Sequence, residues 1–534
     1  MSLNQLAPVK ERAKKSDLLN RYMFHEQYPL WLAINHHRTH TNKRMTFHRH
    51  LYLAPILADS ANQRVVMKGT QGGFSECLCI ITWASAKQGN VVFYVLPTHL
   101  LMERFVSNRF EKSLAYTRYY REQRTSGKSQ SMNRKVLIDN KSLKDIGEGV
   151  VNFVGSGSDV PFVEIPADWL VVDEADKCDA KRLEMAKERL GHASNPVEIY
   201  AGNPTFTGSF LDNKYKDSTM SEWTIKGDCG HHIQIDFFEH VIRKIDDQQY
   251  VLRDEKWTPD LGRDIYPICD KCGKPFDRFG DGVYVDQQNS DISGKRFFRL
   301  FSGNSTVLGL VRTFDKATED DYLMQRFYNS DLGLPFLASG SKVFGHMLDD
   351  CVQDYLMPDK HRGKPCLLGC DVGKKLHVRV NELQDDGSTL AVYIGSVKEF
   401  DEVAEIYKRY NCAVGVIDSR PETRLSKLLS LRFKGMFICD YIHGVKDIVD
   451  RKKILKCDRT GAMDAVKSRI MTQQLGLPKN ARSIPEYYAH MEAPVRVFNE
   501  DKDTYSWEEG SLADHFFHAE VYCEKARQIL IGFG

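Results

Sequence analysis

The sequence predicts an α/β protein built on two sheets, with a small Cys/His-containing segment between them. In residues 46–221, short β-branched runs such as 64–67 and 91–96 alternate with stretches of helical character. This rhythm is typical of parallel strands covered by helices. A second alternation of the same kind begins at Cys366. Between the two, residues 222–300 combine closely spaced Cys and His with many turn residues.

The composition limits the class of protein. The chain has 534 residues, enough for about two to four domains with sizeable cores. Its 74 basic and 72 acidic side chains nearly cancel, so a nucleic-acid surface would have to be a local patch. It has no apolar run that could span a bilayer and no signal-peptide core. Thirteen scattered cysteines favour a reducing compartment, so we expect a soluble intracellular protein.

A glycine-rich turn follows the first strand and precedes a helix. Such a loop cradles phosphates with backbone N–H groups, while a Lys contacts the β/γ oxygens and a hydroxyl holds Mg²⁺. The residue before Ser75, where Lys is usual, is Phe74, so we expect Lys68 to supply the charge. The candidate loop residues are Lys68, Gly69, Gln71, Gly72, Gly73, Phe74 and Ser75. A glycine-rich turn without nucleotide is the alternative.

The run Trp169–Val172 is an apolar strand that ends in Asp173-Glu174, as a Walker B element requires. The first carboxylate would orient Mg²⁺ and the second would polarise the attacking water. Acidic residues are also favoured at helix N-termini, which is the alternative interpretation. A further strand ends in Asn203-Pro-Thr205. In additional-strand ATPases such a strand lies next to Walker B and its polar tip senses the γ-phosphate.

The middle segment contains a possible metal knuckle. Cys269 and Cys272 have the C-x-x-C spacing that lets two thiolates reach one tetrahedral zinc ion. The other half would come from Cys229 with His231 or His232, which gives a structural Cys₃His site. Ordinary reduced cysteines are the alternative.

In the second α/β region, one apolar strand ends in Asp371 and another in Asp418, with a hairpin predicted through 385–387. Asp514 opens a late amphipathic helix. Two strand-end carboxylates and one on a late helix are what an RNase H-like nuclease needs to hold two divalent ions about 4 Å apart. Asp440 and Asp464 compete for the third position, and we interpret Asp464 as a helix or DNA-contact residue.

Four features together resemble the large terminase subunit of tailed bacteriophages, most closely its lambda-type family. They are the lysine at the front of the glycine-rich loop (Lys68), the Walker B strand, the Cys/His knuckle and the three aspartates of the second α/β region. The resemblance covers about residues 45–530 and includes 296–302 and 325–336, which resemble the link between motor and nuclease. It implies an ATP-driven motor that moves double-stranded DNA into a procapsid, and a two-metal endonuclease that cuts the concatemer. Implied cofactors are ATP, Mg²⁺ or Mn²⁺, and structural Zn²⁺.

The resemblance also assigns roles and partners. It implies Glu174, Asp371, Asp418 and Asp514 as catalytic residues, and Asp173, Asn203 and Thr205 as part of the nucleotide site. Implied partners are double-stranded DNA, the small terminase subunit and the portal or procapsid, with a homo-oligomeric ring when docked and no membrane. The expected location is the host cytoplasm during assembly, and not the mature virion.

These motifs divide the chain into five predicted regions. They are an N-terminal helical region at 1–45, a P-loop ATPase domain at 46–221, a zinc-ribbon-like insert at 222–300, a connection at 301–354 and an RNase H-like nuclease domain at 355–534. For DNA contacts to the backbone, the basic stretches 128–135 and 451–453 are candidates, with solvated surface charge as the alternative.

Three departures from the family pattern stand out. Gln71 occupies a loop position where many relatives carry Arg, Lys226 replaces one family Cys, and Asp173-Glu174 is closer to the general ATPase pattern. A DEAD-type helicase, suggested by the string 173–176, is one rival interpretation. A non-enzymatic phage assembly protein with degenerate motifs is the other.

Overall fold

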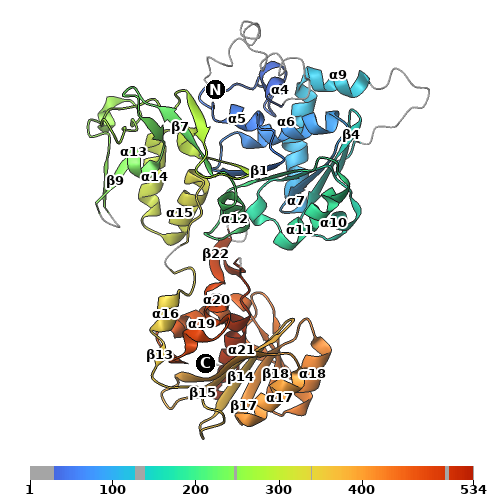
Figure 1. Cartoon of the computed structure of the whole chain (residues 1–534), viewed down its shortest axis with the longest axis vertical. Helices are drawn as coiled ribbons and strands as arrows, with labels where there is room; N and C mark the ends of the chain where they lie inside the picture. Colours follow the sequence, from blue (N-terminus) through green and yellow to red (C-terminus); the bar gives the residue numbers. More distant parts are fainter. Residues whose placement is uncertain are drawn as a thin grey trace, which may run out of the picture. The chain divides into compact units, whose positions relative to one another are not determined.

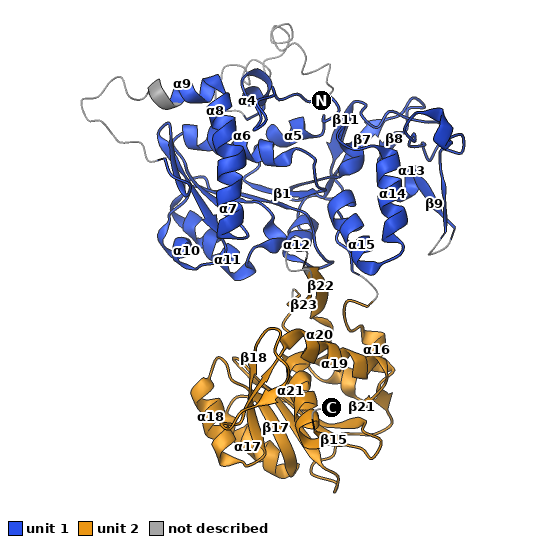
Figure 2. Ribbon diagram, turned by 180° about the vertical axis from the view of Figure 1, so that it is seen from behind, with its two compact units in different colours: residues 1–337 blue, residues 338–534 orange. Residues whose placement is uncertain are grey.

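The computed structural model describes residues 29–126, 139–245, 249–337, 340–499, 504–510 and 512–532. The chain divides into two compact units, Met1–Leu337 and Ala338–Gly534 (Figure 2). The basic stretch 128–135 and residues 1–28 of the predicted N-terminal region lie outside the described residues. None of the described helices combines the length and apolar character needed to cross a membrane.

Unit 1 is built on a sheet whose centre is parallel. Within the described residues it has ten strands in the order β11-β7-β12-β1-β6-β5-β2-β4-β3, with β8 paired to β7. The strands are β1 (Gln63–Lys68), β2 (Val91–Leu96), β3 (Leu143–Ile146), β4 (Gly149–Gly155), β5 (Trp169–Val172), β6 (Val197–Gly202), β7 (Ser221–Lys226), β8 (His232–Gln234), β11 (Gly282–Val285) and β12 (Ser293–Phe297). A separate hairpin pairs β9 (Ile242–Lys244) with β10 (Tyr250–Leu252).

Helices cover both faces of this sheet (Figure 1). They are α4 (Pro29–Asn35), α5 (Leu53–Leu57), α6 (Phe74–Lys87), α7 (His99–Phe105), α8 (Glu111–Tyr116), α9 (Arg118–Ser126), α10 (Val160–Glu164), α11 (Ala180–Glu188), α12 (Phe210–Lys216), α13 (Phe237–His240), α14 (Val307–Ala317) and α15 (Asp321–Arg326). Successive residues of β1 point to opposite faces. Val66 packs in the cluster that contains α6, and Val65 packs in the cluster that contains α11 and α12.

The strand order confirms the predicted additional-strand arrangement. β6 lies between β1, which leads into the glycine-rich loop, and β5, which ends before Asp173. On the other side of β1 lies β12, so a strand from the 222–300 segment is part of the same sheet. The glycine-rich loop is therefore flanked by the ends of two neighbouring parallel strands.

Unit 2 has a mixed sheet in the order β13-β21-β16-β15-β14-β17-β18-β20-β19. Its strands are β13 (Val352–Gln353), β14 (Cys366–Val372), β15 (Leu376–Leu383), β16 (Thr389–Val397), β17 (Cys412–Asp418), β18 (Met436–Tyr441), β19 (Ile448–Val449), β20 (Ile454–Cys457) and β21 (Leu475–Pro478). β22 (Val495–Asn499) and β23 (Thr504–Glu508) form a separate hairpin. The predicted hairpin through 385–387 is confirmed, since β15 and β16 are antiparallel neighbours.

The helices of unit 2 also lie on both faces of its sheet. They are α16 (Gly345–Asp349), α17 (Phe400–Arg409), α18 (Thr423–Arg432), α19 (Arg459–Met471), α20 (Tyr487–Glu492) and α21 (His515–Ile531). Leu367 of β14 packs in the cluster that contains α19 and α21, and Leu368 packs in the cluster that contains α17 and α18. The predicted α/β class is thus confirmed in both units.

Helix α21 is fixed against the sheet by two contacts that matter for its N-terminus. At Gly369 of β14 a Cβ atom would lie 2.0 Å from the Ala519 carbonyl oxygen, so only glycine permits this approach. Below it, the fully buried Arg379 of β15 places Nη2 2.6 Å from Glu520 Oε2. Such a buried pair is strongly destabilising to break, since either charge would be left without a partner. Both contacts hold α21 in register with β14 and β15.

In unit 1 a buried carboxylate anchors the described start of the chain to helix α6. Glu76 Oε2 lies 3.0 Å from His37 Nε2, Oε1 is hydrogen-bonded to His40, and Ser113 Oγ donates at 3.2 Å. Burial alone would raise the pKa of Glu76, but the hydrogen bonds from His37 and His40 outweigh it and lower the pKa to about 2.

We expect this carboxylate to stabilise unit 1 above the ordinary carboxyl pKa of 4.5 and to lose its contribution as pH falls from there toward 2. The shift corresponds to roughly 3 kcal/mol of unfolding free energy. Urea unfolding at pH 5, 4 and 3 should therefore show a smaller acid loss in Glu76→Gln than in wild type. The exposed Glu148→Gln is the control and should follow wild type. Equal acid loss in Glu76→Gln and wild type would contradict this role.

Candidate nucleotide and metal sites

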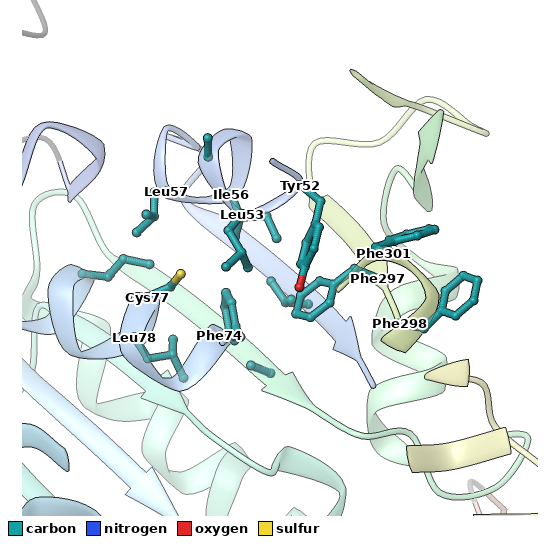
Figure 3. Packing of buried hydrophobic residues seen from close by; sticks show 14 of the residues in the cluster. Tyr52, Leu53, Ile56, Leu57, Phe74, Cys77, Leu78, Phe297, Phe298 and Phe301 are labelled. Carbon is teal, nitrogen blue, oxygen red and sulfur yellow. The ribbon is translucent and has the colours of Figure 1, made fainter. Parts of the chain in front are cut away.

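The glycine-rich loop runs from the end of β1 at Lys68 to the start of α6 at Phe74. Gln71 and Gly73 both have positive φ, at 59° and 84°, so the chain turns sharply into the helix. Gly72 lies against a packed aromatic floor, where a Cβ would come 2.4 Å from Phe297 Cε2. The Tyr52 hydroxyl donates to the Gly72 carbonyl at 2.8 Å, and Phe74 points into the same cluster (Figure 3).

The loop lysine faces the Walker B carboxylates. Lys68 Nζ lies 2.6 Å from Glu174 Oε1 and 3.5 Å from Asp173 Oδ1, and all three groups are largely buried. Burial disfavours the ammonium, yet the two carboxylates outweigh it and raise the pKa of Lys68. Burial raises the pKa of Asp173, whereas at Glu174 the effect of burial is outweighed by Lys68, which lowers the pKa. The Lys68 ammonium therefore lies between two carboxyl groups whose pKa values are shifted in opposite directions, up at Asp173 and down at Glu174.

Glu174 sits in a strained backbone position. Its φ is 55°, in the left-handed region that non-glycine residues rarely adopt. Such conformations persist where the surrounding structure imposes them, and they cluster at functional sites. Here the turn directs the carboxylate to Lys68 rather than away from the strand end.

The polar turn after β6, which contains Asn203 and Thr205, makes several hydrogen bonds beside the Walker B residues. The Thr205 backbone N–H and hydroxyl both donate to Asp176 Oδ2, at 2.8 and 2.9 Å. Asn203 Nδ2 donates to the Asn329 carbonyl at 3.2 Å, and Asn329 Nδ2 donates to the Thr205 carbonyl at 2.6 Å. Sequence reasoning gave no role to Asp176 or Asn329. Asp176 lies in the string 173–176 and Asn329 in the segment 325–336, but neither pattern indicated a role for the single residue.

The segment 327–334 also contacts the phosphate loop itself. The Thr70 backbone N–H and hydroxyl donate to the Ser330 carbonyl, at 2.6 and 3.0 Å. The Gly69 N–H donates to the Phe297 carbonyl at 2.9 Å. Gln71 is exposed, and its carbonyl accepts from Asn304 at 3.2 Å. Ser75 is half-buried in the first turn of α6, at the position where a hydroxyl can face a bound cation.

In unit 2, two predicted carboxylates come together at adjacent strand ends. β14 and β17 are parallel with Cys370 opposite Ile417, so Asp371 and Asp418 follow at the same level. Burial raises the pKa of Asp418 to about 6, and the nearby Asp371 charge adds to the shift. Two acids in this proximity suit a divalent cation, which would remove their mutual repulsion.

The third carboxylate, Asp514, stands at the N-cap position of α21 without a capping hydrogen bond from its side chain. It is buried, and its Oδ2 lies 3.3 Å from His518 Nε2 and 3.7 Å from Arg459 Nη2. Burial would raise the pKa of Asp514, but His518 outweighs it and lowers the pKa. The next residue, His515, places Nδ1 2.9 Å from Asp371 Oδ2, which brings the start of α21 to the end of β14.

The competing carboxylates have other partners. Both oxygens of Asp464 face Arg496, at 2.8 and 3.1 Å, and Oδ1 also accepts from the Trp507 indole N–H at 2.9 Å. Asp440 Oδ1 accepts from the Ser419 hydroxyl. Asp464 therefore has a packing role between α19 and the β22–β23 hairpin.

Residues 54–278 match the family model described as phage terminase large subunit gpA, ATPase domain. This chain carries a phage terminase ATPase domain. The matched range includes the phosphate loop, Walker B, the third strand and the three knuckle cysteines. All of unit 2 lies outside it.

Solved large terminases show a weaker likeness. The large terminase of bacteriophage HK97 is 10% identical over 86% of this chain and 90% of that chain, with a TM-score of 0.48. A large terminase from a thermophilic bacteriophage, in complex with ATP-gamma-S, is 11% identical over 89% and 97%, with a TM-score of 0.30. The large terminase nuclease of thermophilic phage G20c is 11% identical over 35% and 98%, with a TM-score of 0.25. No curated protein matches the chain.

The terminase ATPase domain also contains the predicted knuckle. Atoms Sγ of Cys229, Cys269 and Cys272 lie within 4.8 Å of one another, a spacing that suits one tetrahedral ion. A hydrogen bond with the backbone at His231 lowers the pKa of the exposed Cys229 thiol. The His231 ring instead faces Asp270, with Nε2 3.3 Å from Oδ1, so the structure joins the three thiols without that imidazole. Zinc binding by Cys229, His231, Cys269 and Cys272 stays a prediction.

The basic cluster 451–453 forms the turn before β20. Lys453 Nζ donates to the carbonyls of Ser430 and Phe433, at 3.1 and 3.0 Å. That lysine therefore has a structural role, and Arg451 and Lys452 are the exposed cations of this turn.

Proposed function

We propose that this chain is the motor and nuclease of a viral DNA-packaging machine. It hydrolyses ATP to move double-stranded DNA into a procapsid, and it cuts the concatemer with a metal-dependent endonuclease. The observation that carries the proposal is the contact of Lys68 with Asp173 and Glu174 inside a domain that matches the terminase ATPase family. Unit 2 supports the nuclease half through its two strand-end carboxylates, Asp371 and Asp418.

In the ATPase, the chain's own residues supply charge and position. Backbone N–H groups of 71–73 and the start of α6 bind the phosphates, since those of Gly69 and Thr70 donate within the protein, and Lys68 neutralises the β/γ oxygens. Asp173 and the Ser75 hydroxyl are the oxygen donors that would hold Mg²⁺, which would neutralise phosphate charge in the transition state. Glu174, held ionised by Lys68, is placed to orient the attacking water and accept its proton.

In the nuclease, Asp371, Asp418 and Asp514 would hold Mg²⁺ or Mn²⁺. Two such ions would activate water and stabilise the leaving oxygen. Asp371 and Asp514 are buried, and Asp418 follows the strand next to that of Asp371, whose charge raises its pKa. Asp514 reaches this place through α21, whose first residue His515 contacts Asp371. Structural Zn²⁺ on the knuckle cysteines belongs to the same proposal.

The proposal includes the partners that such a motor needs. They are double-stranded viral DNA, a small terminase subunit and the portal of a procapsid, on which copies of the chain form a ring. The place of action is the host cytoplasm during assembly, and the chain is absent from the mature virion. No membrane is involved.

One experiment separates this function from its rivals. Purified full-length chain is incubated with ATP and either plasmid DNA in Mn²⁺ or a forked duplex in Mg²⁺. We expect DNA-stimulated ATP hydrolysis and double-strand cleavage, without release of a strand from the fork. Unwinding without cleavage would favour a DEAD-type helicase. Background ATPase that Lys68→Ala leaves unchanged would favour a non-enzymatic assembly protein.

A further inference from the structure

The nuclease centre contains histidines that the carboxylate trio does not include. His377 lies directly opposite Asp371 in the antiparallel pairing of β15 with β14, so both side chains emerge on the same face of the sheet. His515 of α21 contacts Asp371 from above, with Nδ1 2.9 Å from Oδ2. The ligand atoms of Asp371, His377 and His515 all lie within 4.8 Å of one another.

The ring nitrogens of His377 have no hydrogen-bond partners in their described surroundings. The residue is 3% exposed, and neither ring nitrogen has a hydrogen-bond partner among the described residues. Its ring stacks on His515, with centroids 4.7 Å apart and planes 16° apart, while Phe516 and His490 close the other sides. Buried polar atoms are normally hydrogen-bonded. Two unpartnered nitrogens beside a carboxylate therefore indicate a missing partner at this place.

The access to the group supports an exchangeable ligand. His515 has a side chain that is 40% exposed, whereas those of Asp371 and His377 are buried. An ion can therefore reach the group from solvent and then be enclosed on the protein side by the sheet. Two imidazoles and one carboxylate are borderline donors that suit Mn²⁺, Co²⁺, Ni²⁺ or Zn²⁺ better than Mg²⁺, which prefers oxygen ligands throughout.

We propose that Asp371, His377 and His515 form a binding site for a divalent transition-metal ion at the nuclease centre. Asp371 is shared between this site and the oxygen pair with Asp418. The inference rests on the proposed nuclease function for its role, since it makes one of the two ions nitrogen-ligated and leaves Asp418 and Asp514 for the other. It predicts that the nuclease prefers transition-metal ions to Mg²⁺, because imidazole nitrogens are among the ligands.

The test is Mn²⁺ binding to the full-length chain without nucleotide, followed by electron paramagnetic resonance. The free Mn²⁺ signal gives the affinity, and electron spin-echo modulation detects imidazole ¹⁴N bound to the ion. Mn²⁺ is chosen because thiolates such as the knuckle cysteines bind it poorly. We expect deep ¹⁴N modulation in wild type, shallower modulation in His377→Asn, which keeps His515, and loss of the modulation in the double variant His377→Asn/His515→Asn. Affinity should fall at least about tenfold in His377→Asn. His443→Asn, a 77% exposed histidine of the same unit, should behave as wild type.

Absence of ¹⁴N modulation in wild type would overturn the proposal without any variant, so a variant that fails to fold does not protect it. Modulation as deep in folded His377→Asn as in wild type, or modulation that persists in the folded double variant, would also overturn it. Cleavage of plasmid DNA, measured on the same samples, keeps the two proposals apart. Cleavage without a nitrogen signal would reject this site and keep the nuclease function. A nitrogen signal without cleavage in any metal would keep the site and reject the nuclease function.

Discussion

Glu174→Gln is expected to lower ATP turnover by about 10²- to 10⁴-fold, the range that a positioned general base contributes. The amide keeps the shape of the side chain but cannot accept the proton of the attacking water. Lys68 would lose its 2.6 Å ionic partner and keep Asp173 at 3.5 Å, so its charge remains compensated. Nucleotide binding should therefore stay measurable by fluorescence titration while phosphate release falls.

The matched control is Glu188→Gln, on α11 in the same unit, whose side chain is 73% exposed. It should hydrolyse ATP as wild type does. Lys68→Ala should behave differently from Glu174→Gln, because it removes the phosphate contact and leaves two buried carboxylates without a cation. We expect loss of both binding and turnover. Normal turnover in folded Glu174→Gln would remove this residue from the catalytic role.

The second large effect is expected in the other unit. Asp371→Asn should lower Mn²⁺-dependent cleavage of plasmid DNA about 10³-fold, because metal ions supply several kcal/mol of transition-state stabilisation and this residue lies between both proposed ions. DNA-stimulated ATP hydrolysis should remain unchanged, since Asp371 belongs to unit 2 and the nucleotide residues to unit 1.

The control for this prediction is Asp385→Asn, in the turn between β15 and β16, where the side chain is 96% exposed. It should cleave normally. Asp464→Asn adds a sharper comparison, since its contacts with Arg496 and Trp507 predict a loss of stability with cleavage retained in the folded fraction. Loss of ATPase and nuclease activity together from Asp371→Asn, in folded protein, would contradict the two-site description.

Much of the fold follows from local pattern. The β-branched runs at 91–96 and 169–172 predict strands that the structure contains with the same bounds. The closeness of Asp371 and Asp418 also follows, because parallel neighbours end at the same edge of a sheet. In each case the sequence signal lies within one short segment, or in two strand segments that each end in Asp.

The contacts that sequence reasoning missed join segments far apart in the chain. His377 meets Asp371 through the register of β14 with β15, and meets His515 only because Gly369 lets α21 approach the sheet. Asn329 reaches Thr205 across 124 positions of sequence. No periodicity or spacing rule encodes such meetings, since they depend on how finished elements pack. The same holds for His231, whose closeness to Cys229 in sequence suggested a ligand that the structure directs to Asp270.

Two consecutive residues of the segment 327–334 act as a brace across the nucleotide site. Ser330 accepts from Thr70 of the phosphate loop, and Asn329 exchanges hydrogen bonds with the turn that contains Asn203 and Thr205. The phosphate loop and the 203–205 turn cannot move apart without breaking hydrogen bonds to this one short stretch of chain. Unit 1 ends only a few residues later, at Leu337. Any movement of the phosphate loop or of the 203–205 turn would therefore pull on residues 329–330, close to the C-terminal end of unit 1.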